Sequence, residues 1–325
     1  MIIKIIGLIT TLIFSHGALA AAQPPAKSPR IGFLFVGSKD QPHLESFHQG
    51  LREIGYVDGK NISIEYRYAE RNSDRLPVLA AELVALDLNA ILTTTPAATR
   101  AVLRANGAVP IVAIGFDPVA TGLVESLARP GGNVTGLSSS AGPEMMGKRL
   151  DLLKEAFPKT SSVVMLWNPE AGQFAKQVLE GAKTGAKTLG IKLRPYEIRS
   201  TGDIDRAFDE LKKLQANALI IPGGAMMTLN SKRIVDLATR LRLPAIYQTG
   251  QFVADGGLMA YGVNYGDLYR RAAVYVDKII KGAKPADLPV ELPMKFELFI
   301  NLKAAEQIGV TMPPNVLARA DKVIR

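Results

Sequence analysis

Short apolar runs alternate with helix-like segments along the whole chain, and this alternation restricts the possible folds more than any other feature. The first run, residues 30–38, is almost entirely apolar, as expected for a strand that is buried on both faces. Residues 43–54 follow with apolar side chains at helical spacing and end at Gly55. Further strands are expected at 61–68, 89–95 and 110–116, and further helices at 74–86 and from Pro96. Strands that alternate with helices form a parallel sheet with right-handed crossovers.

The same order of elements returns in the second half of the chain. Strands are expected there at 162–167, 191–198, 217–222 and 244–248, and helices at 171–189, 203–214 and 228–241. The likeness extends to residues: segment 52–66 parallels 187–198, and 86–94 parallels 214–222. A repeat of this length is too long for a solenoid and predicts two related, doubly wound α/β lobes.

The repeat suggests where the lobes begin and end. We expect lobe 1 to comprise 29–138 plus about 264–285, lobe 2 to comprise 142–258, and a C-terminal segment, 286–325, to pack on both. The glycine-rich passage 117–138 lies near the join and is expected to act as a hinge, since glycines absorb changes in backbone angles. Two more crossings are expected, at 256–264 and near 282–289, and three crossings would restrict the motion to a hinge bend.

The N-terminus has the pattern of a cleaved secretory signal. Lys4 precedes an apolar run from Ile5 to Phe14, which is too short to span a bilayer, and Ala18-Leu19-Ala20 fits an A-x-A cleavage site. We therefore predict a signal peptide at 1–20 and a periplasmic location. The chain has no cysteine, which excludes disulfides and a lipid-anchor thiol. Its net charge of +9 is dispersed among acidic residues, so no nucleic-acid partner is expected.

Enzyme motifs are weak in this sequence. Residues 142–149, GPEMMGKR, fit the spacing of a phosphate-binding P-loop, but Arg149 stands where a Ser or Thr would hold the magnesium ion. Only two histidines follow the predicted signal peptide, His43 and His48, and their spacing of five does not place them on one helix face for a metal. His43 is expected to be a surface or cap residue. No catalytic constellation, metal site or cofactor is predicted.

A ligand site is predicted from the ends of the strands, because ligands of open parallel sheets bind beyond the carboxyl ends. The candidates are Gly37, Ser38, Thr94, Thr95, Pro96, Ala97, Asp117, Asn168, Gly223, Gly224, Tyr247 and Gln248. Thr94, Thr95 and Pro96 precede a helix whose free N–H groups suit a carboxylate, although Thr95 also fits an ordinary N-cap. Asp117 suits an ammonium group, although Asp-Pro also initiates turns. Tyr247 and Trp167 either stack on an aromatic ligand or belong to the core.

Several stretches resemble a known family. They include "DPVATGLVESLARPGGNVTGLS", "GKRLDLLKEAFP", "GGLMAYG", "LYRRAAVYVDKIIKGAKPADLPVE" and "KFELFINLKAAEQIG", in order over nearly all of 29–325. They are similar to ABC transporter substrate-binding proteins of the periplasmic-binding-protein type 1 fold, in the group that includes tryptophan- and tyrosine-binding members. One departure is Gln251-Phe-Val-Ala-Asp255, where relatives often have a Glu in E-F-V-E-A.

The resemblance implies a non-enzymatic, monomeric protein that closes on a small molecule. The expected ligand is amino-acid-like, with aromatic amino acids among the options, and the expected partners are an inner-membrane ABC permease and its ATPase. A sensory binding protein, which would present its ligand to a signalling receptor without transport, is the alternative.

Overall fold

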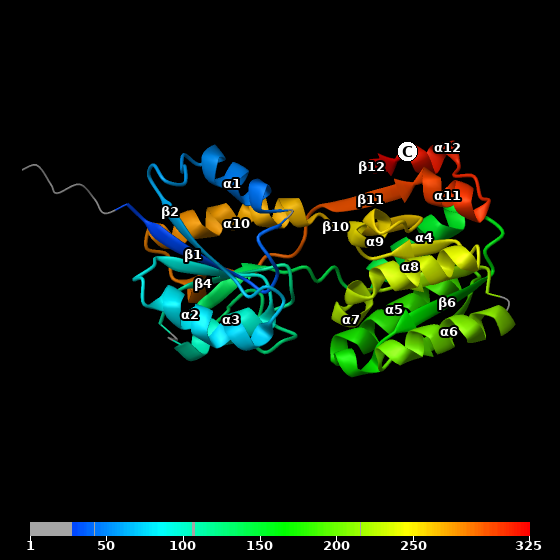
Figure 1. The fold of residues 1–325 in the computed structure, drawn as a ribbon, viewed down its shortest axis with the longest axis horizontal. Coiled ribbons are helices and arrows are strands. Elements are labelled where there is room, and N and C mark those ends of the chain that lie inside the picture. Colours follow the sequence, from blue (N-terminus) through cyan, green and yellow to red (C-terminus); the bar gives the residue numbers. More distant parts are fainter. Residues whose placement is uncertain (1–27, 42, 106–107, 215) are drawn as a thin grey trace, which may run out of the picture.

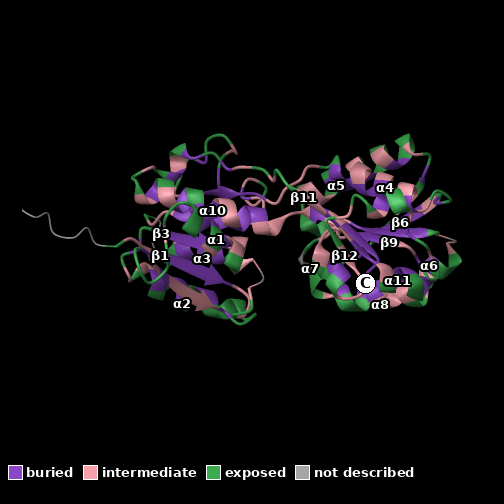
Figure 2. Ribbon diagram, turned by 90° about the horizontal axis from the view of Figure 1, so that it is seen from above, coloured by how far each residue is buried: buried purple, intermediate pink, exposed green. Residues whose placement is uncertain are grey.

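The computed structural model describes residues 28–41, 43–105, 108–214 and 216–325, which form two α/β lobes (Figure 1). The predicted signal peptide, residues 1–20, lies outside the described residues. Each lobe has a central sheet whose strands are mostly buried, with helices on both faces (Figure 2). The prediction of two parallel-sheet lobes is confirmed.

Lobe 1 is built on a five-stranded sheet in the order β2-β1-β3-β4-β5, and all of its pairs are parallel. The strands are β1 (Arg30–Phe35), β2 (Ser63–Tyr68), β3 (Ala90–Thr93), β4 (Ile111–Ile114) and β5 (Val134–Leu137). Helices α1 (Leu44–Glu53) and α10 (Tyr265–Ile280) cover one face. On the other face lie α2 (Leu76–Val84), preceded by the short helix η1 (Ser73–Arg75), and α3 (Pro96–Ala105).

Lobe 2 has a seven-stranded sheet in the order β12-β11-β10-β9-β8-β6-β7. The strands are β6 (Ser162–Trp167), β7 (Lys192–Glu197), β8 (Ala218–Ile221), β9 (Ala245–Tyr247), β10 (Met259–Val263), β11 (Phe296–Asn301) and β12 (Lys322–Ile324). One face packs against α4 (Met145–Ala156), α5 (Gln173–Thr188), α11 (Leu302–Ile308) and α12 (Pro314–Leu317). The other packs against α6 (Thr201–Lys213), α7 (Ala225–Leu229), α8 (Ser231–Arg240) and α9 (Gly250–Ala254). A short helix, η2 (Pro169–Ala171), follows β6.

The two sheets share one strand order. The order β2-β1-β3-β4-β5 in lobe 1 matches β7-β6-β8-β9-β10 in lobe 2, so the repeat seen in the sequence is a repeat of topology. Lobe 2 then departs from the repeat, because β11 joins antiparallel to β10 and β12 follows parallel to β11. The segment 286–325 therefore supplies two strands of the second sheet in addition to packing on it.

The hinge lies elsewhere than the glycine-rich passage. Residues 117–138 belong to lobe 1, because Val124 is in its core and Val134–Leu137 forms its strand β5. The expectation that this passage is the hinge was wrong: the glycines serve a turn and a short buried strand. The chain crosses first between β5 and α4, and again between β10 and α10.

The third crossing also differs from the expected position. Helix η3 (Pro285–Asp287) and Val290 still pack on lobe 1, so the chain leaves that lobe only after Glu291. The crossings run side by side: the Ser138 N–H donates to the Glu291 carbonyl at 2.9 Å, and the Asn264 N–H donates to the Lys295 carbonyl at 3.0 Å. The third crossing segment is thus hydrogen-bonded to each of the other two, and the three form one band between the lobes.

Candidate functional site

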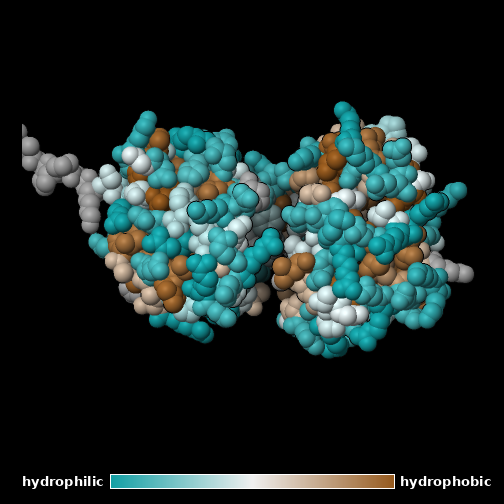
Figure 3. Space-filling view, viewed as in Figure 1, coloured by the Kyte–Doolittle hydropathy of each residue, from teal (hydrophilic) through white to brown (hydrophobic). Residues whose placement is uncertain are grey.

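The carboxyl ends of both sheets face the space between the lobes. β5 ends just before the first crossing into lobe 2, and β1, β3 and β4 run parallel to it, so their ends point toward lobe 2. β10 ends just before the second crossing into lobe 1, and β6, β8 and β9 run parallel to it. The surface is hollowed between the lobes at this level (Figure 3). The strand-end residues predicted from the sequence therefore line two edges that face each other.

On lobe 1 the candidates come from three adjacent strands, β1, β3 and β4. Gly37 and Ser38 follow β1 and are half-buried, and the Ser38 carbonyl accepts a hydrogen bond from the Gln41 side chain. Thr94 and Thr95 follow β3, and Asp117 follows β4. The sheet thus brings these residues together, although they lie far apart in the sequence.

Part of the hydrogen-bonding capacity of the N–H groups at the start of α3 is used within this segment itself. The Thr95 hydroxyl accepts from the Ala98 N–H at 3.2 Å, so Thr95 is a helix cap, which is the simpler of its two interpretations. Pro96 has no N–H to offer. The Ala97 N–H and the Thr94 hydroxyl make no hydrogen bond to any residue that the structure describes, and they are the polar groups left for a ligand.

Asp117 combines a turn with an available oxygen. Its Oδ1 accepts the N–H groups of Val119 at 3.0 Å and Ala120 at 2.9 Å, as in an Asp-initiated turn. Its Oδ2 has no partner within the part of the chain that the structure describes. The turn fixes the carboxylate at the edge of the sheet and leaves one oxygen for a cation.

On lobe 2 the strand ends are again adjacent, in the order β9-β8-β6. The Asn168 Oδ1 after β6 accepts from the Glu170 N–H at 2.8 Å and caps η2. Gly223 has φ +104°, and a Cβ there would lie 1.1 Å from the Gln248 Oε1, so glycine makes room for that amide. Gly224 is exposed beside it. Gly223, Gly224 and Gln248 form one polar group at this edge.

Tyr247 lies in the core. It is 1% exposed, and its ring stacks on Phe252 with centroids 4.7 Å apart. Of the two alternatives given for Tyr247, these contacts support the core: strand β9 has helices on both faces, and a side chain within it is covered by α9. Trp167, 8% exposed, likewise belongs to the core of lobe 2.

The sequence analysis missed a group of residues at the crossings. Tyr265 is the first residue of α10, and a Cβ on Gly115 would lie 3.1 Å from its ring. The Ser139 hydroxyl donates to the Gly115 carbonyl at 2.7 Å. His43 is half-buried with its ring stacked on Tyr265, centroids 5.8 Å apart, and burial lowers the pKa of His43. His43 stands at the N-cap position of α1, one of the two positions expected for it, but its side chain makes no cap hydrogen bond and packs on Tyr265.

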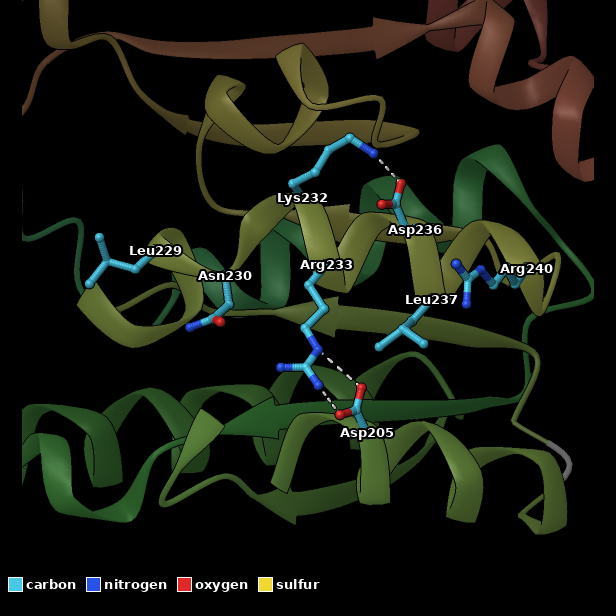
Figure 4. A pocket seen from close by; sticks show the side chains of 8 residues that line it. All are labelled: Asp205, Leu229, Asn230, Lys232, Arg233, Asp236, Leu237 and Arg240. Atoms are coloured by element: carbon cyan, nitrogen blue, oxygen red, sulfur yellow. Dashed lines mark hydrogen bonds and ion pairs between the residues drawn. The ribbon is translucent and has the colours of Figure 1, made fainter. Parts of the chain in front are cut away.

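A separate pocket of 480 Å³ lies on the flank of lobe 2, along α8 and toward α6 (Figure 4). Arg233 reaches from α8 to Asp205 of α6, donating from Nε to Oδ1 at 3.1 Å. Lys232 and Asp236 form a second ion pair at its rim. None of the strand-end candidates lines this pocket, and four of its five charged residues form these two ion pairs, with Arg240 as the fifth.

Comparison with known proteins agrees with the resemblance noted in the sequence. The family model for "ABC transporter substrate binding protein" matches residues 39–324. A tyrosine-binding protein of Clostridioides difficile (strain R20291) is 25% identical over 258 residues, which are 79% of this chain and 73% of that protein.

Solved structures extend the likeness to the fold. An ABC domain from Streptococcus pneumonia, in complex with L-Trp, has 25% identity and a TM-score of 0.76, covering 92% of this chain and all of that one. A conserved domain protein from Vibrio cholerae has 27% identity and a TM-score of 0.75, over 91% of this chain and all of that one. The fold is that of a periplasmic binding protein of type 1, and the chain belongs to the family of ABC transporter substrate-binding proteins.

Proposed function

We propose that this protein is the solute-binding component of an ABC uptake transporter and that it binds an amino acid between its lobes. The observation that carries the proposal is the pair of facing sheet edges, each lined by polar groups and joined by three crossings. Such an arrangement suits a small molecule that touches both lobes and favours their closure. The similarity to proteins described as binding tyrosine and L-Trp makes aromatic amino acids the first candidates.

The lobe 1 edge supports a ligand with an ammonium group. Asp117 presents one unpaired carboxylate oxygen, held in place by its turn, and Thr94 and Ala97 offer neutral polar groups nearby on the adjacent strand end. No bond is made or broken in this function: the protein binds, closes and presents its ligand to the permease and its ATPase.

Export is part of the proposal. Among the described residues, no helix combines the length and apolarity that crossing a membrane requires. The proposal of export rests on the A-x-A site at Ala18–Ala20, which suits a mature protein that begins near Ala21 in the periplasm. N-terminal sequencing of periplasmic material tests it, and a retained Met1 would contradict it.

Asp117→Asn tests the ammonium contact. Asparagine keeps an oxygen for the turn and removes the charge, so we expect the affinity for L-tyrosine or L-tryptophan to fall at least about tenfold in calorimetry. Glu125→Gln is the matched control, because Glu125 is exposed in the following loop and its change should leave affinity within about twofold. If the parent protein binds none of the twenty amino acids, the amino-acid proposal is wrong.

A further inference from the structure

Arg149 of α4 is a buried cation that contacts β10 near the second crossing between the lobes. The residue is 4% exposed. Its Nε donates to the Tyr261 carbonyl of β10 at 2.7 Å, and its Nη1 contacts the Met146 sulfur at 3.3 Å. Within the described chain no carboxylate pairs with this guanidinium, and Nη2 has no hydrogen-bond partner. Arginine is rarely buried to this extent without an anionic partner, because an uncompensated buried charge is costly.

The guanidinium lies at the edge where the predicted site is. Tyr261 belongs to β10 and directly follows the two residues of that strand that pair with β9. It lies three residues before Asn264, where the chain crosses to lobe 1 for the second time. A Cβ built on Gly262 would lie 1.8 Å from the Gln248 carbonyl and 3.9 Å from Arg149 Nη2. Nη2 is therefore close to Gln248, one of the strand-end candidates of lobe 2.

Lobe 1 approaches the same point through Tyr265. Burial raises the pKa of Tyr265, while the charge of Arg149 opposes this rise, so the phenol lies within the field of the guanidinium. A Cβ on Gly115 would lie 3.1 Å from the Tyr265 ring, and Asp117 follows two residues later. Tyr265 thus lies beside the strand end that carries Asp117 and within the influence of Arg149, so both charges are near this residue.

We infer that Arg149 is the anchor for the carboxylate of the bound amino acid, with the Tyr265 and Ser139 hydroxyls beside it. This rests on the proposed function and revises the sequence-based expectation that the start of α3 holds the carboxylate. The α3 start offers one unpaired N–H and no net charge, whereas Arg149 offers a full charge and a fork that matches a carboxylate. Burial lowers the pKa of Arg149 to about 10, which leaves it protonated at neutral pH.

The test compares ligands that differ only in the carboxylate. L-tyrosine and L-tryptophan are titrated by calorimetry beside their carboxamides, into the parent protein, Arg149→Met and Lys148→Met. We expect the parent to prefer each amino acid to its amide, and Arg149→Met to lose about 30-fold or more for the amino acids while its affinity for the amides changes less than about threefold. Lys148→Met removes the same charge from the exposed side of α4 and should change neither.

Each outcome bears on the inference. If Arg149→Met loses the same factor for acid and amide, the arginine is only a structural tether and the inference is wrong. If the parent binds acid and amide equally, it is also wrong, and this result needs no variant. Should Arg149→Met fail to fold, Arg149→Lys keeps the charge without the fork and should weaken only acid binding. A parent protein that binds no amino acid at all overturns the proposed function and the anchor with it.

Discussion

At the scale of single residues, Gly136 shows how little room the first sheet leaves at its edge. Its φ is +142°, and a Cβ there would lie 1.9 Å from the Ala113 carbonyl oxygen of the neighbouring strand β4. Both groups are backbone, so neither can move aside without breaking the pairing of β4 with β5. A glycine is required at this position by a close approach of two strands.

Gly136→Ala should therefore destabilise the protein by roughly 3 kcal/mol, because backbone strain and overpacking add. Gly132→Ala, in the same loop-to-strand region, meets no atom within 4 Å and should change stability by less than about 0.5 kcal/mol. Urea unfolding midpoints at equal protein concentration measure both. Equal midpoints for the two variants would contradict the close approach.

At the scale of elements, the start of α6 depends on one carboxylate. The Oδ2 of Asp203 accepts the N–H groups of Ser200 at 2.7 Å and Arg199 at 2.9 Å, and Asp203 also pairs with Arg206. The hydrogen bonds from the Ser200 and Arg199 backbone, followed by that from Arg206, lower the pKa of Asp203 from 3.8 to about 2.

Because folding lowers the pKa of Asp203, the stability that this residue contributes falls as the pH falls. Because the folded pKa is the lower one, the stabilisation is complete above pH 3.8 and is lost as the pH falls toward about 2. Asp203→Asn should therefore lower the urea midpoint at pH 7, and the difference from the parent should shrink between those two pH values. A difference that persists unchanged at the acid end would show that the charge is not responsible.

Element positions were largely predictable, and their exceptions have local causes. The alternation of apolar runs located β1 to β4 and β6 to β9, because most of these strands carry runs of buried apolar side chains. Strands β10, β11 and β12 were not predicted as strands. The helix expected at 228–241 is instead two, since the Asn230 N–H bonds to the Met226 and Met227 carbonyls and ends α7. Strand β5 was missed because Val134–Leu137 is short and contains Gly136, so only its pairing with β4 identifies it.

From the sequence, only those candidate-site residues that lie at the carboxyl ends of strands could be predicted. Thr94 and Gln248 follow their strands directly, and Asp117 comes three residues after the end of β4, so the rule for parallel sheets finds all three. Arg149 and Tyr265 lie 116 positions apart and come close only because two crossings return to one place. The sequence around Arg149 and around Tyr265 contains no motif that indicates that the two residues are close in the fold.

At the scale of the whole molecule, ligand binding should bring the lobes together. A ligand shifts this equilibrium only if it binds the closed form more tightly, as a molecule touching both edges would. We expect the radius of gyration from X-ray scattering to fall when L-tyrosine or L-tryptophan saturates the protein. Asp117→Asn at the same ligand concentration should remain more extended, and an unchanged radius in the saturated parent would argue for a rigid site.

The late position of α10 in the sequence also determines when lobe 1 can be completed during synthesis. This helix covers one face of the lobe 1 sheet, yet the ribosome makes it only after strands β6 to β10 of lobe 2. A nascent chain that has reached Val263 holds its first sheet without the buried side chains of Tyr265–Ile280, so that face is still open to chaperones or to a translocation channel. Lobe 1 is therefore begun first but is completed only after the first five strands of lobe 2 have been made.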